Sequence, residues 1–276
     1  MSAGLNTFRI PFVMERMAPS GLAASLAPSY LANLTAVVDH VTASGRNDTF
    51  AVVDAHNYGR YKNAVITDTA AFKTFWSNLA APFANNSRVI FDCNNEFHDM
   101  GASSATLVPA LNQACIDGVR AAGATSQYVF VEGTSYTGAW TWVSSGNGAS
   151  MGNLTDPSDK IVYEMHQYLD TDGSGTHTEC VNATIGAERI RAATAWLKEN
   201  KKVGILGEFA GGSNDVCKQA VRGMLASMQE DSDVWLGWLW WAAGPFWGDY
   251  IYSLEPGEGI AFTNYLTLLQ EFVSLP

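Results

Sequence analysis

Three features are absent from this chain, and each absence excludes a class of proteins. No apolar run approaches the roughly 20 residues needed to cross a bilayer, which argues against a membrane span. Only 16 lysines and arginines stand against 27 aspartates and glutamates, and a formal charge of −11 disfavours nucleic-acid binding, which relies on basic clusters. No stretch resembles a linker or a low-complexity tail, so residues 1–276 are predicted to form one domain with a full core.

Cysteine is scarce, and its four copies include no CxxC pair, which argues against a zinc site. Cys180 and Cys217 flank one apolar run, and a disulfide between them would tie the loops around it. In the chain-entropy model, closing a loop of about 37 residues is worth roughly 3–4 kcal/mol. Cys93 and Cys115 could form a second disulfide, but two buried free thiols fit the sequence equally well.

Seven apolar runs have the length and composition of buried strands, and segments with helical spacing lie between most of them. This alternation, with a period of roughly 35 residues, predicts repeated βα units around a parallel sheet, an α/β fold. The strands are expected at Phe8–Phe12, Phe50–Asp54, Val89–Asp92, Tyr128–Glu132, Ile161–Met165, Val203–Gly207 and Val234–Trp240. The helices are expected at Pro28–Ser44, Thr69–Ala84, Ser104–Ala122, Thr184–Asn200, Asn214–Glu230 and Gly259–Val273.

Two glutamates, Glu96 and Glu208, are expected just past the ends of two of these strands. In parallel α/β folds the carboxyl ends of the strands meet at one rim, where the chemistry is placed. Two carboxylates delivered there by different strands are the minimum equipment for acid/base or nucleophilic work on an acetal. Other polar and aromatic residues are expected at this rim: His56, Asn57, Asn95, His166, Tyr168 and Trp241, with Arg9 inside the first strand.

Several neighbours of this rim are open to a structural or a functional interpretation. The chain has nine tryptophans, and flat aromatic faces in a cleft are what sugar rings stack against. Asp54 is expected to make hydrogen bonds at the rim rather than to catalyse. Glu132 and Glu164 are expected to support the rim, with Glu132 as the fallback carboxylate. The aromatic residues that serve either as distal sugar platforms or as rim packing are Trp140, Trp142, Phe246 and Trp247.

Five Asn-X-Ser/Thr acceptor sequences favour a secreted glycoprotein. Most of them are expected in loops or on exposed helix faces. The chain shows no signal peptide, so an extracellular location is inferred for its parent protein. The acceptors are Asn33, Asn47, Asn85, Asn153 and Asn182.

Six short motifs follow one another at the expected strands. They are Phe8-Arg9-Ile10-Pro11-Phe12, Asp54-Ala55-His56-Asn57-Tyr58, Asn94-Asn95-Glu96, Met165-His166-Gln167-Tyr168-Leu169-Asp170, Gly207-Glu208-Phe209-Ala210-Gly211-Gly212 and Trp240-Trp241-Ala242-Ala243-Gly244-Pro245. In their order and spacing the chain resembles glycoside hydrolase family 5, and within it the fungal secreted endo-β-1,4-glucanases. The resemblance implies a (β/α)8 TIM barrel and retaining hydrolysis of β-glucan polysaccharides or cello-oligosaccharides, with no metal or organic cofactor.

The resemblance also implies a role for each motif residue. Glu96 is the acid/base, expected to hold a proton, and Glu208 is the nucleophile. Asn95 binds the sugar 2-hydroxyl, and Trp241 lies beneath the sugar next to the cleaved bond. The remaining expectations are that His166 and Tyr168 orient the carboxylates, that Arg9 sits under the nucleophile, and that His56 and Asn57 line the cleft.

Two departures from the family pattern stand out. Phe97 follows the acid/base where the family usually has proline, at a position outside the chemistry. The opening residues Met1–Asn6 resemble the tail of a first helix, so the first strand is expected to be missing and the barrel to have about seven strands. The exposed edges, Phe8–Phe12 and Val234–Trp240, predict a homodimer, with the alternative that the two edges pair with each other and shrink the barrel. The alternatives to an endo-β-1,4-glucanase are a relative that acts on mannan or another β-glucan, and a non-hydrolytic glucan-binding fragment.

Overall fold

Two compact units make up the chain in the computed structural model, which describes residues 3–43 and 48–273. The N-terminal unit consists of Asn6–Thr137 and Ser144–Tyr163, and the C-terminal unit consists of Met1–Leu5, Gly138–Val143 and Glu164–Pro276. Strand β7, Ile161–Gln167, begins in the N-terminal unit and ends in the C-terminal unit.

Four parallel strands form the sheet of the N-terminal unit, each paired with its successor: β1 (Thr7–Phe12), β2 (Phe50–Ala55), β5 (Val89–Asp92) and β6 (Val129–Glu132). Every residue of β5 and β6 is buried, as expected of parallel strands covered on both faces. A small antiparallel hairpin, β3 (Arg60–Tyr61) with β4 (Ala64–Val65), follows β2.

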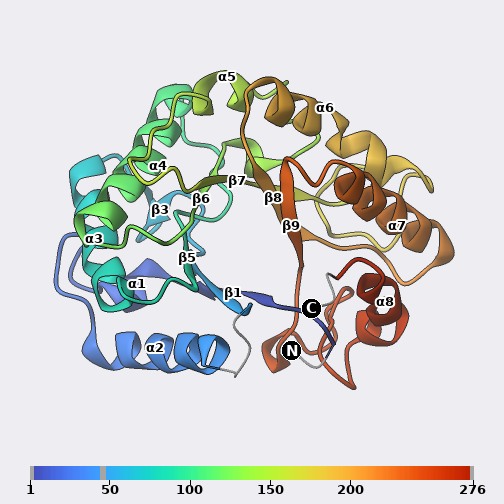
Figure 1. Cartoon of the computed structure of the whole chain (residues 1–276), viewed down its shortest axis with the longest axis horizontal. Helices are drawn as coiled ribbons and strands as arrows, with labels where there is room; N and C mark the ends of the chain where they lie inside the picture. The colour runs from blue at the N-terminus through green and yellow to red at the C-terminus, as the bar shows by residue number, and fades with distance from the viewer. Residues whose placement is uncertain (1–2, 44–47, 274–276) are drawn as a thin grey trace. The chain divides into compact units, whose positions relative to one another are not determined.

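The helices of this unit are α1 (Met14–Met17), α2 (Pro28–Thr42), α3 (Thr69–Ala80), α4 (Ser104–Ala121) and α5 (Asn147–Met151), with 3-10 turns η1 (Ala81–Phe83) and η2 (Ser135–Thr137). Helices α3 and α4 lie side by side (Figure 1). They meet at Gly118, where an added Cβ would lie 2.4 Å from the carbonyl oxygen of Lys73. This close approach of the two helices requires glycine at position 118.

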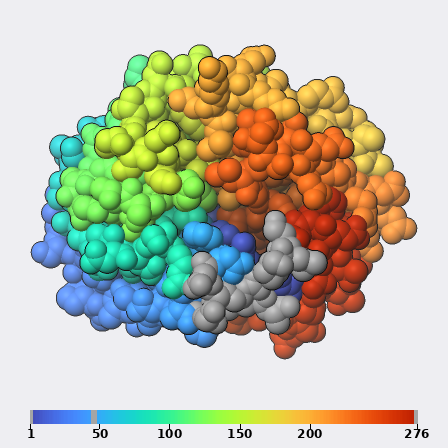
Figure 2. All heavy atoms as spheres, in the orientation of Figure 1, coloured from blue at the N-terminus to red at the C-terminus, as the bar shows by residue number. Residues whose placement is uncertain are grey.

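The C-terminal unit contains the end of β7 together with β8 (Gly204–Phe209) and β9 (Trp235–Trp240). Its helices are α6 (Ile185–Glu199), α7 (Asp215–Glu230) and α8 (Ile260–Gln270), with a 3-10 turn η3 (Pro245–Trp247). Helix α7 packs on α6 and on α8, and the orange residues of α7 adjoin the red residues of α8 in the space-filling view (Figure 2).

The strand and helix predictions agree with the structure to within two residues at nearly every boundary. Seven parallel strands follow one another in the order β1-β2-β5-β6-β7-β8-β9, which confirms the predicted α/β class with about seven strands. The sequence analysis did not anticipate α1, α5 or the β3–β4 hairpin. It was wrong in one detail of the rim, because His166 and Glu208 lie inside β7 and β8 rather than beyond them.

Both predicted disulfides are present. Cys93, which directly follows β5, is bonded to Cys115 of α4, and both residues are fully buried. Cys180 is bonded to Cys217 of α7. The alternative of two buried free thiols at Cys93 and Cys115 is therefore wrong.

Candidate active site

Arg9 is the centre of a buried charge cluster in the N-terminal unit. Its guanidinium lies 3.2 Å from Asp54 and 2.7 Å from Asp92, and its Nη2 lies 3.1 Å from Glu132. The same Nη2 donates to Asn95 Oδ1 at 2.8 Å. Guanidinium offers five donors in a rigid fork, which suits it to hold the ends of several strands in one geometry. Arg9 thereby fixes side chains from β2, β5 and β6.

Asn94 and Asn95 hold the segment that leads from β5 to Glu96. Asn94 accepts the backbone N–H of Gly59 and donates to the carbonyl of Ala55 at 3.1 Å. Asn95 is fully buried, and its Nδ2 has no hydrogen-bond partner among the residues that the structure describes. A buried donor without a partner is costly, so this amide is suited to donate to a ligand hydroxyl.

Glu96 is partly buried and has a left-handed backbone, with φ of 46°. Its N–H donates to Glu132 Oε2 at 2.6 Å, and its carbonyl lies 3.0 Å from His98 Nδ1. The rings of His98 and Tyr136 stack with centroids 4.3 Å apart. The position of the Glu96 backbone is therefore set by contacts with residues beyond its own loop.

His56 and Asn57 follow β2 and have different surroundings. His56 Nδ1 lies 2.8 Å from Asp54 Oδ2, which orients the ring. Asn57 accepts the N–H of Met14 at 2.8 Å and donates to Glu15 at the same distance. These contacts give Asn57 a structural role in joining the loop after β2 to α1.

Glu208 lies in β8 and is 4% exposed. The hydroxyl of Tyr168 donates to its Oε2 at 2.8 Å, and His166 Nδ1 lies 3.7 Å from the same oxygen. On its other side, His166 Nε2 lies 3.4 Å from Glu164 Oε1. Glu164 also packs against Gly207, where an added Cβ would lie 1.7 Å from Oε1, so this position of β8 requires glycine. His166 and Tyr168 thus both contact Glu208, and the expectation that they orient both carboxylates stays a prediction.

A chain of aromatic rings runs from Trp241 to Tyr168 in the C-terminal unit. Successive ring centroids lie 5.2 Å apart for Trp241–Trp247, 4.8 Å for Trp247–Tyr250, 5.6 Å for Tyr250–Tyr252 and 6.4 Å for Tyr252–Tyr168. Burial raises the pKa of Tyr250, and the nearby charge of Glu208 adds to the rise. Tyr250 therefore keeps its proton and remains a hydrogen-bond donor near the carboxylate.

Trp140 differs from its neighbour Trp142. Trp142 is fully buried and packs edge-to-face on Trp196, so its role is rim packing. Trp140 is 48% exposed, and the guanidinium of Arg189 lies 4.3 Å from its ring centroid. Arg189 also donates to the carbonyl of Tyr168 at 2.6 Å. Arg189 thus contacts both the ring of Trp140 and the backbone of Tyr168. The exposed face of Trp140 forms a flat apolar platform.

Phe246 and Trp247 lie on the turn η3 between two glycines with positive φ, Gly244 at 128° and Gly248 at 50°. Phe246 is 89% exposed, whereas Trp247 is partly buried against Trp241. Phe246 therefore presents an aromatic ring to solvent, while Trp247 supports the predicted sugar platform.

Asp170, Asp172 and His177 lie close enough together within the C-terminal unit to hold a metal ion. The buried carboxylate of Asp170, however, accepts hydrogen bonds from Ser174 Oγ and from the N–H groups of Gly175 and Thr176. Burial would raise the pKa of Asp170, but these bonds and one from His177 outweigh it and hold the pKa below its ordinary value. Asp170 and the groups bonded to it, the Asp170 cluster, therefore fix the loop after Tyr168.

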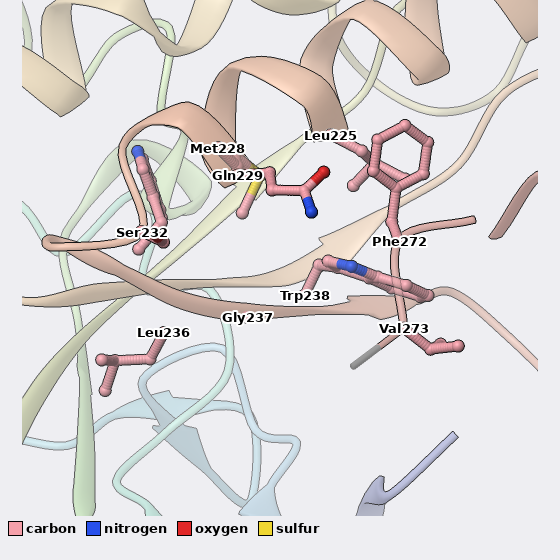
Figure 3. A pocket seen from close by; sticks show the side chains of 10 residues that line it. Leu225, Met228, Gln229, Ser232, Leu236, Gly237, Trp238, Phe272 and Val273 are labelled. Atoms are coloured by element: carbon pink, nitrogen blue, oxygen red, sulfur yellow. The ribbon is translucent and has the colours of Figure 1, made fainter. Parts of the chain in front are cut away.

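A hollow of about 170 Å³ lies between α7 and β9. Glu208 is not one of the residues that line it. Figure 3 shows Trp238 beneath the hollow and Leu225, Met228 and Phe272 above it. Leu236, which also lines the hollow, is 51% exposed. Gln229 and Ser232 add polar groups to this lining, which contains no acidic or basic side chain.

Each unit therefore supplies one carboxylate in a polar, partly enclosed setting. A carboxylate whose oxygen is held by a tyrosine hydroxyl is suited to act as a nucleophile. A partly exposed carboxyl is suited to exchange a proton. The partners of Arg9 described above belong to the same unit as Glu96. The predicted place of Arg9 under Glu208 remains a prediction.

Comparison with known proteins gives a consistent result over nearly the whole chain. A family model described as cellulase, glycosyl hydrolase family 5, matches residues 1–244. Endo-beta-1,4-glucanase B of Emericella nidulans is 58% identical over 274 residues, which cover 99% of this chain and 81% of that protein.

Solved structures agree with the sequence comparison. Endo-beta-1,4-glucanase Xac0029 from Xanthomonas axonopodis pv. citri has a TM-score of 0.91 at 35% identity, covering 99% of this chain and 88% of that chain. A structure of XacCel5A in complex with cellopentaose has a TM-score of 0.90 at 36% identity, covering 98% and 87%. These similarities confirm the predicted fold class.

Proposed function

The chain belongs to the cellulase family, glycosyl hydrolase family 5, and we propose that it is a retaining endo-β-1,4-glucanase that cleaves internal bonds of cellulose and related β-glucans. The observation that carries the proposal is the 58% identity with a named endo-β-1,4-glucanase over 99% of the chain. We further propose that the two units form one catalytic domain, because each contributes one of the two required carboxylates.

Glu208 is proposed as the nucleophile. Its burial and the hydroxyl of Tyr168 on Oε2 fix one oxygen, so that attack on the anomeric carbon needs little reorganisation. In the first step a Glu208 oxygen bonds to that carbon as the glycosidic C–O bond breaks. The product of this step is a glycosyl ester of Glu208.

Glu96 is proposed as the acid/base. In the first step it gives its proton to the leaving glycosidic oxygen, and in the second it takes a proton from water as that water attacks the anomeric carbon. The ester bond to Glu208 then breaks, so both glutamates return to their starting states. Retention by this route requires the carboxyl groups to lie about 5–5.5 Å apart.

The substrate is proposed to be bound by Asn95 and by aromatic platforms. The Nδ2 of Asn95, which has no partner within residues 3–43 and 48–273, supports a hydrogen bond to the sugar 2-hydroxyl. Trp241, backed by Trp247, supports stacking beneath the sugar next to the cleaved bond. Trp140 and Phe246 supply exposed rings for more distant sugars.

A turnover assay on this chain tests the proposal. We expect release of reducing ends from carboxymethylcellulose at a higher rate than from glucomannan or β-mannan, with the β-anomer formed first in an NMR time course. Faster turnover of mannan would show that the chain acts mainly on another β-glycan. Binding of cello-oligosaccharides without release of reducing ends would identify a non-hydrolytic binder. An α-anomer as the first product would contradict retention.

An extracellular location is proposed for the parent protein. Two disulfides are typical of oxidising compartments. The acceptors Asn33, Asn85, Asn153 and Asn182 are exposed, whereas Asn47 lies outside the described residues. Within residues 3–43 and 48–273, no helix has the length and apolar character needed to cross a membrane. Removal of N-glycans from protein made in a fungal host should lower its mass, and an unchanged mass would contradict glycosylation.

A homodimer through β9 is also proposed. The strand comes last in the sheet order, and Leu236 is exposed on it beside the hollow around Trp238 (Figure 3). An exposed apolar edge strand tends to pair with another chain, here a second copy. Light scattering should give a dimer that Leu236→Glu converts to a monomer. Val216→Glu, at an exposed valine on α7, is the control and should leave the dimer intact. A monomeric parent chain would contradict the proposal.

A further inference from the structure

Glu96 has a backbone conformation that a side-chain-bearing residue rarely adopts. Its φ of 46° lies in the left-handed region, which is strained for a residue other than glycine. Such a conformation persists only where surrounding contacts enforce it. The residue proposed as acid/base therefore depends on whichever groups hold its backbone in place.

Glu132 supplies one of these contacts. Its Oε2 accepts the N–H of Glu96 at 2.6 Å, and its Oε1 accepts Nη2 of Arg9 at 3.1 Å. Both oxygens act as acceptors, as expected of an ionised carboxylate, and hydrogen bonds to ionised acceptors are about twice as strong as neutral ones. Glu132 is fully buried, so this arrangement is also protected from water.

The backbone of Glu132 is itself held by helix α4. The side chain of Asn112 donates to the carbonyl of Glu132 at 2.9 Å and accepts its N–H at 3.2 Å. One turn further along α4, Cys115 is bonded to Cys93, three residues before Glu96. Helix α4 thus anchors both the chain leading into Glu96 and the carboxylate that holds the N–H of Glu96.

We propose that Glu132 is a positioning residue for acid catalysis, which holds the Glu96 segment so that the Glu96 carboxyl is directed at the leaving oxygen. This inference rests on the proposed role of Glu96 as acid/base. It differs from a role as counter-ion, in which Glu132 would only balance the charge of Arg9. It also differs from a role as the acid itself, because both oxygens of Glu132 already accept hydrogen bonds inside the protein.

The test is the dependence of kcat/KM on the leaving group in a series of aryl β-cellobiosides, from dinitrophenyl to unsubstituted phenyl. A good leaving group needs no proton, whereas phenol does, and general acid catalysis contributes about 10²–10⁴-fold. Glu132→Gln keeps the size of the side chain but replaces one acceptor with a donor. We expect kcat/KM to fall about 10- to 100-fold for phenyl cellobioside and less than about 2-fold for dinitrophenyl cellobioside.

Two further variants separate positioning from the alternatives. Glu132→Asp keeps the negative charge near Arg9 but is one methylene shorter, so it should show the same selective loss if positioning matters. Parent-like values in Glu132→Asp would favour the counter-ion role and overturn the inference. Asp156→Asn is the matched control, because Asp156 is a buried carboxylate that pairs with Arg120 in the same unit, and it should leave the leaving-group dependence unchanged.

Other outcomes are equally decisive. An equal loss of kcat/KM across the whole series in Glu132→Gln, or no loss, would overturn the inference and leave Glu96 as acid/base. If Glu132→Gln does not fold, Glu132→Asp and Asn112→Ser carry the same test. If Glu96→Ala itself shows no dependence on the leaving group, the proposed role of Glu96 fails, and the inference fails with it by a separate observation.

Discussion

The two glutamates are held in opposite ways. Glu208 lies in a regular strand, and its side chain is fixed by the hydroxyl of Tyr168. Glu96 lies in a left-handed turn, and its backbone N–H is fixed by Glu132. A nucleophile benefits from one charge state in one position, whereas an acid/base must change its protonation between steps. Fixing the side chain of Glu208 and the backbone of Glu96 would meet the demands of the roles proposed for them.

Replacing each glutamate in turn is the strongest way to break this comparison. Glu208→Gln should lower kcat by about 10⁴-fold or more on every substrate, because no other group forms the glycosyl ester. Glu96→Ala should lose activity on cellulose but keep most of its activity on dinitrophenyl cellobioside. Binding of cellopentaose, measured by calorimetry, should stay near normal in Glu208→Gln. Substantial cellulase activity in both variants would refute the assignment.

Removing one hydroxyl sharpens the comparison on the side of the nucleophile. Tyr168→Phe deletes a hydrogen bond to a charged acceptor, worth about 1.5–3 kcal/mol, so kcat should fall roughly 10- to 100-fold. Tyr163→Phe is the control, because its hydroxyl donates to the carbonyl of Met151 in the other unit. Steady-state kinetics on carboxymethylcellulose measures both. Equal losses in the two variants would indicate that the effect of Tyr168 is only structural.

The stability of the loop after Tyr168 should depend on pH. The low pKa of Asp170 gives stability that is present above the ordinary value of 3.8 and lost as the pH falls through its folded value. His177 has a raised pKa because of its hydrogen bond to Asp170, and its contribution is present below 6.5 and lost as the pH rises through its folded value. The Asp170 cluster therefore contributes most to the free energy of unfolding between these two pH limits.

Asp170→Asn should accordingly lower the free energy of unfolding by about 2–3 kcal/mol near pH 5–6, through loss of hydrogen bonds to a charge. The difference from the parent chain should shrink below pH 4. Thermal unfolding at several pH values measures this difference. A difference that does not depend on pH would contradict the stabilising role of the Asp170 charge. Asp156→Asn provides a comparison in the N-terminal unit, where burial opposes the hydrogen bonds from Arg120 but the pKa is again lowered.

The smallest expected effect concerns the distal platform. Trp140→Ala removes the exposed ring above Arg189, and stacking on such a ring is worth about 0.5–1.5 kcal/mol. We expect KM for cellopentaose to rise roughly 3- to 10-fold with kcat nearly unchanged. Phe246→Ala tests the other exposed ring in the same assay. A fall in kcat without a change in KM would show that Trp140 acts through Tyr168 rather than through substrate.

The sequence predicted the seven strands because buried parallel strands form continuous apolar runs. It also predicted which polar residues would stand at their ends. It placed Glu208 beyond its strand because a charged residue usually ends an apolar run, whereas Tyr168 supplies the hydrogen bond that allows Glu208 to remain in β8. The propensity of a single residue was overridden here by a contact 40 positions away in the chain.

The supports of the site were harder to predict than its reactive groups. Asn112 lies inside a helix, and its partner is the backbone of a residue 20 positions later, which no local spacing reveals. Arg189 is similar, because a buried arginine on an amphipathic helix looks like a surface charge until its carbonyl partner at Tyr168 is known. The left-handed backbone of Glu96 also has no sequence signal, since such positions usually carry glycine or asparagine.

The disulfide between Cys93 and Cys115 has a consequence for how the protein is made and handled. Both sulfur-bearing residues are fully buried, so a thiol reductant reaches this bond only after the surrounding structure opens. Purified enzyme should therefore tolerate mild reductants in an assay buffer. Synthesis in a reducing cytoplasm is a different matter, because there the chain folds before oxidation and the segment entering Glu96 loses its covalent link to α4. The choice of expression host, more than the choice of buffer, therefore decides whether the segment that leads into Glu96 is linked to α4.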